Sequence, residues 1–258
     1  MKCTSYTVHT SIPASMTIAL CSDLHDNDYT QAVALLNSHK PDLIALPGDI
    51  GEDAQNLAGN GLGFMKACAS IAPTVYALGN HDKAFSSHQK MAERIHESGV
   101  ILLDDSDVFL RGIWIGGLTT GFRHQKREGY FTPAPEPILS WLDESFCRRD
   151  GFKLLLSHHP EYYPAYFRER DIQLILSGHA HGGQWQFFGR GVLAPGQGLF
   201  PKLTHGVHEN RLVISRGMGD HTRIPRLFNP KEIVMIHLCP QLGQVVFLYC
   251  RKDCMRYV

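Results

Sequence analysis

Five short segments of the sequence combine histidine with carboxylate or amide side chains, which are residue types that bind divalent transition metals. In chain order the segments contain Asp23 and His25; Asp49; Asn80, His81 and Asp82; His158 and His159; and His179 and His181. Oxygen and nitrogen donors without cysteine favour Mn, Fe, Zn, Co or Ni over Ca or a structural zinc bound by thiolates. Each segment alone is more often a polar turn or a buried histidine, but five in one chain favour a shared metal site.

The residue types in these segments suit the hydrolysis of a phosphate ester. Asp49 stands alone on a glycine turn, and its two carboxylate oxygens could bridge two cations. Cations about 3.5 to 4 Å apart lower the pKa of a bound water and clamp the attacking and leaving oxygens of a phosphoryl transfer. Asn80 offers a neutral oxygen, His81 could protonate the leaving alkoxide, and Asp82 could orient His81. We therefore interpret His81 and Asp82 as catalytic candidates.

Each of the five segments follows a short apolar run that is typical of a buried strand. These runs cover residues 16–22, 42–46, 74–78, 152–156 and 172–176, and shorter strands are expected near 100–103 and 113–116. Helical spacing occurs at residues 29–37, 62–70, 87–97, 137–146 and 163–170. Alternating strands and helices predict parallel pairing with right-handed crossovers, and ligands bind at the carboxyl ends of such strands. The five segments are therefore expected to meet in one pocket.

The pattern changes after Gly183. Strands are expected at residues 184–188, 212–215, 233–238 and 244–249, joined by glycine, proline and polar residues. Because no long helical pattern lies between them, the C-terminal third is predicted to be mostly β. The sequence has no repeat of fixed period and no linker long enough to separate domains, so residues 1–258 are predicted to form a single domain.

The composition bounds the partners and the compartment. The 258-residue chain has a formal net charge of zero, which argues against a nucleic acid or an anionic membrane as its partner. Its seven cysteines are odd in number and scattered, which argues against a disulfide framework and favours a reducing compartment. The first 15 residues lack the apolar segment of a signal peptide, and no run approaches the length of a membrane span. We expect a cytoplasmic protein without a membrane span, for which peripheral membrane contact is not favoured.

The order of these motifs resembles that of the calcineurin-like metallophosphoesterase superfamily. The motifs are DxH at Asp23 and His25, GD at Asp49, GNHD at residues 79–82, a histidine after a strand at His158, and GHxH at His179 and His181. The resemblance implies an α/β fold, a four-layer α-β-β-α sandwich of two mixed β-sheets flanked by helices (the metallo-dependent phosphatase fold). It also implies a phosphoesterase with two divalent transition-metal ions.

The resemblance implies a role for each residue as well. In that family, the residues that correspond to Asp23, His25, Asp49 and His181 hold the first metal. Those that correspond to Asp49, Asn80, His158 and His179 hold the second metal. The residue that corresponds to His81 is the catalytic imidazole and does not bind a metal. His159 is expected to support His158 by fixing the orientation of its ring.

Other stretches narrow the resemblance to one branch and suggest substrate contacts. GHAHGGQ, GLFPKLTHG and SRGMGDHTRIPRLFNPKEIVMIHL look like a bacterial branch of phosphodiesterase-like enzymes that includes UDP-2,3-diacylglucosamine diphosphatases. This branch implies a phosphorylated small molecule or a lipid-linked substrate, cleaved at a monoester, diester or diphosphate linkage. Arg123 and His124 in the loop 121–130, and Arg216 after a predicted strand, are candidates for holding a substrate phosphate. A solvated basic loop is the more common structure for the first two.

Two other functions remain as alternatives. One is a catalytically inactive metal-binding scaffold of the same fold, which would be expected to have lost ligands that this sequence retains. The other is a nuclease of the same superfamily. The neutral charge and the lack of a long basic, aromatic-rich groove disfavour a nuclease.

Overall fold

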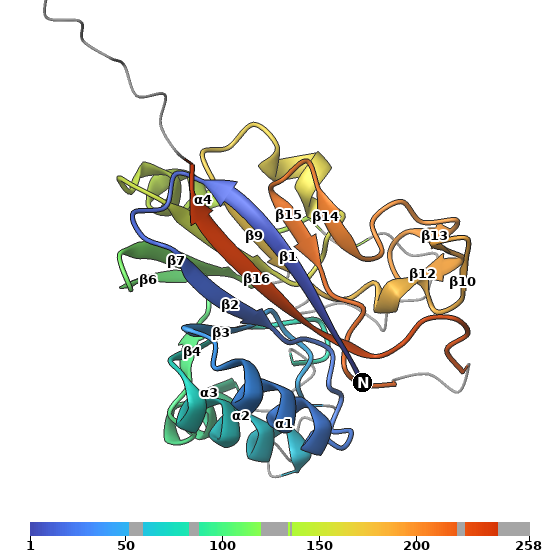
Figure 1. Cartoon of the computed structure of the whole chain (residues 1–258). Helices are drawn as coiled ribbons and strands as arrows, with labels where there is room; N and C mark the ends of the chain where they lie inside the picture. Colours follow the sequence, from blue (N-terminus) through green and yellow to red (C-terminus); the bar gives the residue numbers. More distant parts are fainter. Residues whose placement is uncertain (52–58, 83–87, 120–133, 135, 221–224, 242–258) are drawn as a thin grey trace, which may run out of the picture.

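The computed structural model describes residues 1–51, 59–82, 88–119, 134, 136–220 and 225–241. Two six-stranded β-sheets lie face to face, with helices on their outer faces (Figure 1). Within these ranges, no helix combines the length and the apolar character that crossing a bilayer requires.

The first sheet has the strand order β1-β16-β2-β3-β4-β5. Its strands are β1 (Lys2–Thr10), β16 (Glu232–Pro240), β2 (Met16–Leu20), β3 (Leu43–Leu46), β4 (Thr74–Ala77) and β5 (Ile101–Leu103). Strands β2 to β5 pair in parallel, as the alternation of strands and helices predicts. β16 pairs antiparallel with β2 and parallel with β1, so a late segment of the chain joins the sheet formed by the early strands.

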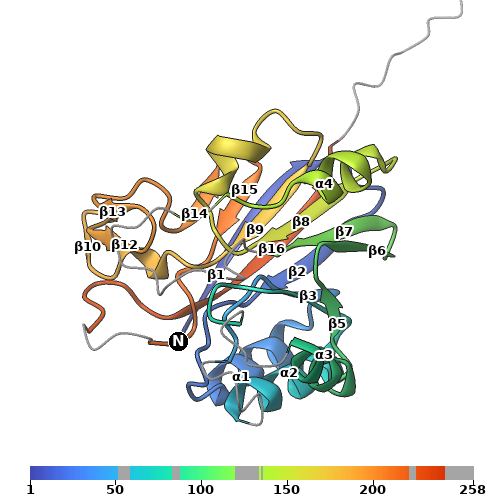
Figure 2. The same ribbon diagram turned by 180° about the vertical axis from the view of Figure 1, so that it is seen from behind.

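Three helices cover the outer face of the first sheet. They are α1 (Thr30–His39), α2 (Asn60–Ile71) and α3 (His88–Glu97) (Figures 1 and 2). Buried side chains such as Leu36 of α1 and Phe64 of α2 pack in one apolar cluster with Ile44 and Tyr76 of the sheet. Lys40 ends α1 with a positive φ of 46°, which turns the chain towards β3.

The second sheet has the strand order β14-β15-β9-β8-β7-β6. Its strands are β14 (Gly206–His208), β15 (Leu212–Ile214), β9 (Leu174–Ser177), β8 (Lys153–Ser157), β7 (Ile113–Leu118) and β6 (Ser106–Leu110). The four inner strands are parallel and the two edge strands are antiparallel. A short helix α4 (Ser140–Glu144), a 3-10 turn (Phe146–Arg148) and a π-helical turn (Tyr163–Phe167) pack against its outer face.

An apolar core fills the space between the two sheets. Leu20, Leu43 and Val75 of the first sheet share this core with Leu154 and Leu174 of the second, and all five are fully buried. The inner strands are therefore covered on both faces, which explains their continuous apolar runs. The arrangement of helices, sheet, sheet and helices confirms the four-layer α/β fold implied by the resemblance.

Several elements differ from the expectations drawn from the sequence. The helix expected at residues 163–170 is a single π-helical turn, in which the N–H of Arg168 donates to the carbonyl of Tyr163. The helix expected at 137–146 is limited to α4 and the following 3-10 turn. β1 was not predicted, because its sequence is largely polar and its partner β16 lies more than 220 residues further along the chain.

Short hairpins replace the longer strand expected at residues 184–188. β10 (Gln186–Phe187) pairs with β11 (Arg190–Gly191), and β12 (Leu193–Ala194) pairs with β13 (Gly198–Leu199). These hairpins lie at one side of the molecule, away from α4 and β6 (Figures 1 and 2). The strand expected at 244–249 lies outside the described residues.

Candidate metal centre

The segments that carry the candidate ligands follow β2, β3 and β4 in the first sheet and β8 and β9 in the second. Within each sheet these strands are adjacent and parallel. Because parallel strands end at the same edge of a sheet, each sheet presents its polar segments together. Packing of the two sheets then brings the segments of both sheets into contact.

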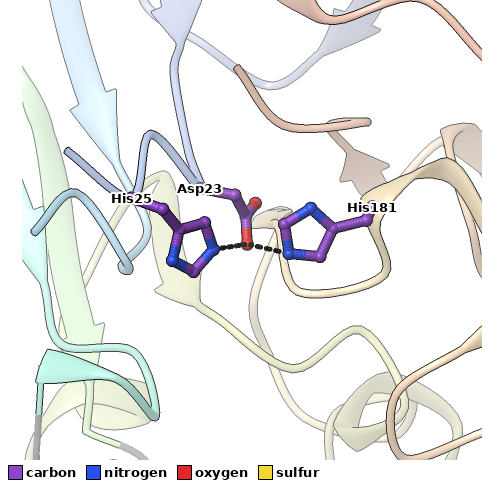
Figure 3. A group of neighbouring side chains, drawn as sticks. All are labelled: Asp23, His25 and His181. Atoms are coloured by element: carbon purple, nitrogen blue, oxygen red, sulfur yellow. Dashed lines mark ion pairs between the residues drawn. The ribbon is translucent and has the colours of Figure 1, made fainter. Parts of the chain in front are cut away.

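The first group of donors consists of Asp23, His25 and His181, whose ligand atoms lie within 4.8 Å of one another. The Asp23 carboxylate lies between the two imidazoles (Figure 3), with Oδ1 4.0 Å from Nε2 of His25 and 3.6 Å from Nε2 of His181. The Ser22 hydroxyl donates to Asp23 Oδ2 at 2.6 Å, and the backbone N–H of His179 donates to Oδ1 at 3.0 Å. These two hydrogen bonds therefore fix the orientation of the carboxylate, in which Oδ1 faces the rings of His25 and His181.

The second group consists of Asp49, His158 and His179, again within 4.8 Å. Nδ1 of His158 donates to the carbonyl of Pro47 at 2.8 Å, which directs Nε2 of the same ring to Asp49 Oδ2 at 3.0 Å. The two groups adjoin, because His158 Nε2 is also 3.9 Å from Asp23 Oδ1. Asp49 also belongs to a further group with His25 and His81. Its carboxylate therefore lies near His25 of the first group as well as near His158 and His179 of the second.

The backbone of the candidate ligands is strained. The φ angles of Asp23, His25, Asp49, His179 and His181 are 52°, 49°, 55°, 65° and 45°. L-residues rarely adopt this left-handed conformation, which costs on the order of 1 to 3 kcal/mol at each position and clusters at functional sites. Its concentration in these loops shows that the surrounding fold holds the side chains in directions that the local chain disfavours.

Two glycines allow the loops to approach one another closely. A Cβ at Gly79 would clash with Oδ1 of Asp49, and a Cβ at Gly178 would clash with Oδ2 of Asp23. Any side chain at either position would displace a candidate ligand. The glycines in the GNHD and GHAH segments are therefore required by the packing of the two carboxylates.

Electrostatic interactions keep the Asp49 carboxylate ionised and the His179 and His181 imidazoles neutral, but they favour the protonated form of His158. Burial opposes a charge on Asp49, but the imidazoles of His158 and His81 outweigh it and hold the Asp49 pKa well below its usual range. Burial also opposes a charge on His158, but the Asp49 carboxylate outweighs it and raises the His158 pKa to about 10. Burial, with neighbouring imidazoles, lowers the pKa of His179 and His181 well below the usual value. These two rings are therefore neutral near pH 7, which is the form that binds metals.

The donor set fits divalent cations. Asp23 and Asp49 are 0% and 1% exposed, and among the described residues only imidazoles lie within ion-pair distance of them. Oδ1 of Asn80 is buried, and the described part of the chain offers it no hydrogen-bond partner. Once His158 gives up its proton to act as a ligand, these buried carboxylates face only neutral imidazoles, and a cation bound by the oxygens and nitrogens would compensate their charge.

The two catalytic candidates occupy different environments. His81 is half-buried, its ring lies edge-on to that of His25 with centroids 4.9 Å apart, and its backbone N–H donates to Asp49 Oδ1. Asp82 is fully buried, and its Oδ2 accepts hydrogen bonds from the backbone N–H groups of Asp49 and Gly79, both at 2.8 Å. Burial and the charge of Asp49 raise the Asp82 pKa to about 6.

The contacts of Asp82 are with the backbone beside Asp49. Its hydrogen bonds within the described chain go to two backbone groups and not to the His81 ring. Asp49 has a positive φ, and its backbone N–H is buried. A buried N–H needs an acceptor, and Asp82 supplies it. Asp82 therefore fixes the turn that presents Asp49.

Of the three predicted substrate residues, only Arg216 lies within the described part of the chain. Nη1 of Arg216 lies 2.6 Å from Oε2 of the fully buried Glu232, and the Arg216 side chain is only 12% exposed. This pairing does not favour the substrate role expected for Arg216, because its charge is already neutralised inside the protein. Arg123 and His124 lie outside the described residues.

Two residues beside the centre were not singled out from the sequence. Glu161 Oε1 lies 3.2 Å from Nδ1 of His159 and 4.0 Å from Nε2 of His179. Arg226 Nη2 lies 3.2 Å from Nδ1 of His181. Glu161 follows His159 by two residues in the segment SHHPE, and this proximity could have marked it as a candidate from the sequence. No local pattern in the sequence marks Arg226, because it is 45 residues from His181.

Comparisons with known proteins agree with this geometry. Residues 16–183, which contain all five loops, match the family model described as calcineurin-like phosphoesterase. An uncharacterized metallophosphoesterase of Campylobacter jejuni is 27% identical, covering 86% of this chain and 57% of that protein. One of Helicobacter pylori is 26% identical, covering 87% and 60%. The uncharacterized protein YpbG of Bacillus subtilis is 28% identical, covering 87% and 81%. The chain thus spans about three-fifths of the length of the first two relatives.

Proposed function

Because the chain belongs to the calcineurin-like phosphoesterase family, we propose that it is a metal-dependent phosphohydrolase that cleaves a phosphate ester through a binuclear centre. The observation that carries the proposal is the position of Asp49. Its carboxylate is shared between the group that contains His25 and the group that contains His158 and His179. A carboxylate in that position suits the bridging of two cations.

The grouping of the other donors supports one ligand set for each cation. We assign the first cation to Asp23, His25, Asp49 and His181, and the second to Asp49, Asn80, His158 and His179. Cations such as Mn, Fe, Zn, Co or Ni, when bound, would polarise the phosphoryl oxygens and make a water acidic enough to attack near neutral pH.

The protein's own groups orient the ligands and move the proton. The Pro47 carbonyl fixes the tautomer of His158, and the Ser22 hydroxyl with the His179 N–H fixes Asp23. His81 lies half-buried beside His25. From there its imidazole can protonate the oxygen of the leaving group as the ester bond breaks.

The proposed substrate is a phosphorylated small molecule or a lipid-linked phosphate. The hairpins that follow the His181–Gly183 turn expose Phe188 and Phe200, and the later loop exposes Phe228. Exposed aromatic side chains close in sequence to a ligand turn can contact an apolar part of a substrate. The described cysteines are all free, which supports the cytoplasmic location that we propose.

The test is a reconstitution assay. Purified protein is stripped with a chelator, supplied with Mn²⁺, Zn²⁺ or Co²⁺, and assayed on p-nitrophenyl phosphate, bis-p-nitrophenyl phosphate and a nucleoside diphosphate conjugate with and without a lipid chain. We expect hydrolysis only with added cation, and two cations per chain by elemental analysis. Protein that holds cations but cleaves none of these esters would be the inactive scaffold, and preferential cleavage of DNA in a gel assay would indicate a nuclease.

Single-ligand variants test the assignment. His181→Ala should chiefly remove the first cation and His179→Ala chiefly the second, because each ring belongs to a different group of donors. His96→Ala, an exposed histidine on α3, is the matched control and should keep both. Equal loss of both cations from either variant would show that the two positions assemble only as a unit.

A further inference from the structure

A carboxylate that the proposed ligand sets do not use lies directly beside the centre. Glu161 belongs to a group with His159 and His179, in which the ligand atoms are within 4.8 Å of one another. Its Oε1 is 3.2 Å from Nδ1 of His159 and 4.0 Å from Nε2 of His179. His179 also belongs to the group with Asp49 and His158, so Glu161 adjoins the position assigned to the second cation.

The surrounding chain holds the Glu161 carboxylate in place. A Cβ at Gly196, whose φ is +71°, would clash with Glu161 Oε1 and lie 3.7 Å from His179 Nε2. The Gly196 turn therefore packs against both groups at once. On the other side, the rings of His159 and His179 lie 4.0 Å apart between centroids. Glu161 is thus confined between this turn and the two imidazoles.

The charge of Glu161 is not neutralised by a basic side chain. Its side chain is only 19% exposed, and across the described ranges no Lys or Arg lies within ion-pair distance of it. Oε2 is buried and has no hydrogen-bond partner among the same residues. A largely buried carboxylate in this state is unfavourable unless a cation compensates it.

The distance to His179 permits both residues to bind one ion. Two donor atoms that each lie about 2.1 Å from the same ion can be at most about 4.2 Å apart. The 4.0 Å between Glu161 Oε1 and His179 Nε2 falls within this limit. We propose, on the basis of the two-cation function above, that Glu161 is an additional ligand of the second cation. An extra carboxylate oxygen raises the coordination number and favours Mn²⁺ over Zn²⁺ at this position.

The experiment compares wild type, Glu161→Gln and the control Glu97→Gln, an exposed residue on α3. Metal-free proteins are titrated with Mn²⁺ and with Zn²⁺, and bound cation is measured by equilibrium dialysis with elemental analysis. In Glu161→Gln we expect Mn²⁺ to bind at the second position about 10- to 100-fold more weakly than in wild type, and the affinity for Zn²⁺ to fall by a smaller factor. The first cation and the control should be unchanged.

A spectroscopic measurement separates ligation from positioning. Co²⁺ absorbs visible light more strongly when its coordination number falls, so Co²⁺ at the second position of Glu161→Gln should absorb more strongly than in wild type. Weaker binding with an unchanged spectrum would mean that Glu161 only positions its neighbours, and the proposal would be wrong. If Glu161→Gln does not fold, Glu161→Asp retains the charge but withdraws the oxygens, and the same changes are expected in smaller degree.

The possible outcomes distinguish this inference from the proposed function. Two cations in wild type with unchanged affinities in Glu161→Gln would overturn the inference alone. Fewer than two cations in wild type would overturn the binuclear function, and the inference with it. Equal weakening of both cations would overturn the assignment of Glu161 to the second position.

Discussion

Charge is buried at the start of β16 and in the candidate metal centre, and it is neutralised differently in these two places. At the start of β16, the fully buried Glu232 accepts hydrogen bonds from Nη1 of Arg216 at 2.6 Å and from the hydroxyl of Thr4 at 2.7 Å. In the candidate metal centre, the buried carboxylates of Asp23 and Asp49 have only imidazoles as ion-pair partners within the described chain. The first cluster is therefore complete within the protein, whereas the donor atoms of the second suit cations from solution.

A buried lysine elsewhere in the fold is likewise neutralised within the protein. Lys153, whose side chain is 2% exposed, contacts Asp171 at 2.8 Å and donates to the carbonyls of Arg149 and Gly151. Such groups are satisfied as soon as the chain folds and have no remaining capacity to bind a ligand. The centre is the opposite case, because its strained loops hold donor atoms together before their charge is compensated. The difference identifies the incomplete cluster as the one with a chemical function.

The largest effect is expected from removing the shared carboxylate of the incomplete cluster. Asp49→Ala should lose both cations and lower phosphate-ester hydrolysis by at least about 1,000-fold, because both cations then lack a ligand and each supplies several kcal/mol of transition-state stabilisation. Elemental analysis and the reconstitution assay measure the two effects. The exposed Asp150→Ala is the control. A variant with two cations and normal turnover would show that Asp49 does not bridge.

His81→Ala should separate the chemistry of the centre from its assembly. We expect turnover to fall by about 100- to 10,000-fold while both cations remain, because the imidazole contributes a proton and no ligand. Elemental analysis is compared with steady-state kinetics, and His96→Ala serves as control. Loss of a cation from His81→Ala would make His81 a ligand instead.

Arg216→Met tests the complete cluster. Leaving Glu232 buried without its partner should lower the free energy of unfolding by about 3 to 5 kcal/mol, as urea denaturation would measure. The double variant Arg216→Met with Glu232→Leu should recover much of that loss. Folded, metal-loaded Arg216→Met should keep near-normal turnover. If Arg216→Met kept its stability but had a strongly raised KM, Arg216 would be a substrate ligand instead.

The smallest effect concerns pH. Asp49 raises the pKa of His158 to about 10 in the metal-free protein, so His158 is protonated at pH 7 and must lose its proton to bind a cation. Affinity for the second cation should therefore rise with pH by up to about tenfold per unit below the His158 pKa. Calorimetry in two buffers of different ionisation enthalpy should detect about one proton released. An affinity for the second cation that does not change between pH 6 and pH 8 would contradict the ion pair between His158 and Asp49.

Parts of the fold were predictable because their signals are local. The apolar runs that form β2, β3, β4, β8 and β9 stop where polar residues begin, and burial on both faces of a sheet requires such runs. β1 was missed, since a polar edge strand depends on a distant partner for its stability. The π-helical turn at Tyr163–Phe167 was expected to be a longer helix, because spacing alone does not distinguish the two.

The sequence by itself determined the ligand types and their order along the chain, because each donor follows a strand whose end can be recognised locally. Only the tertiary structure decided which donors meet. Asp23 receives the N–H of His179 across 156 positions, and His158 reaches Pro47 across 111. The structure likewise directed Asp82 to the backbone, Arg216 to Glu232, and Glu161 towards His179. Partners of this kind depend on the packing of two sheets, which no local pattern of residues specifies.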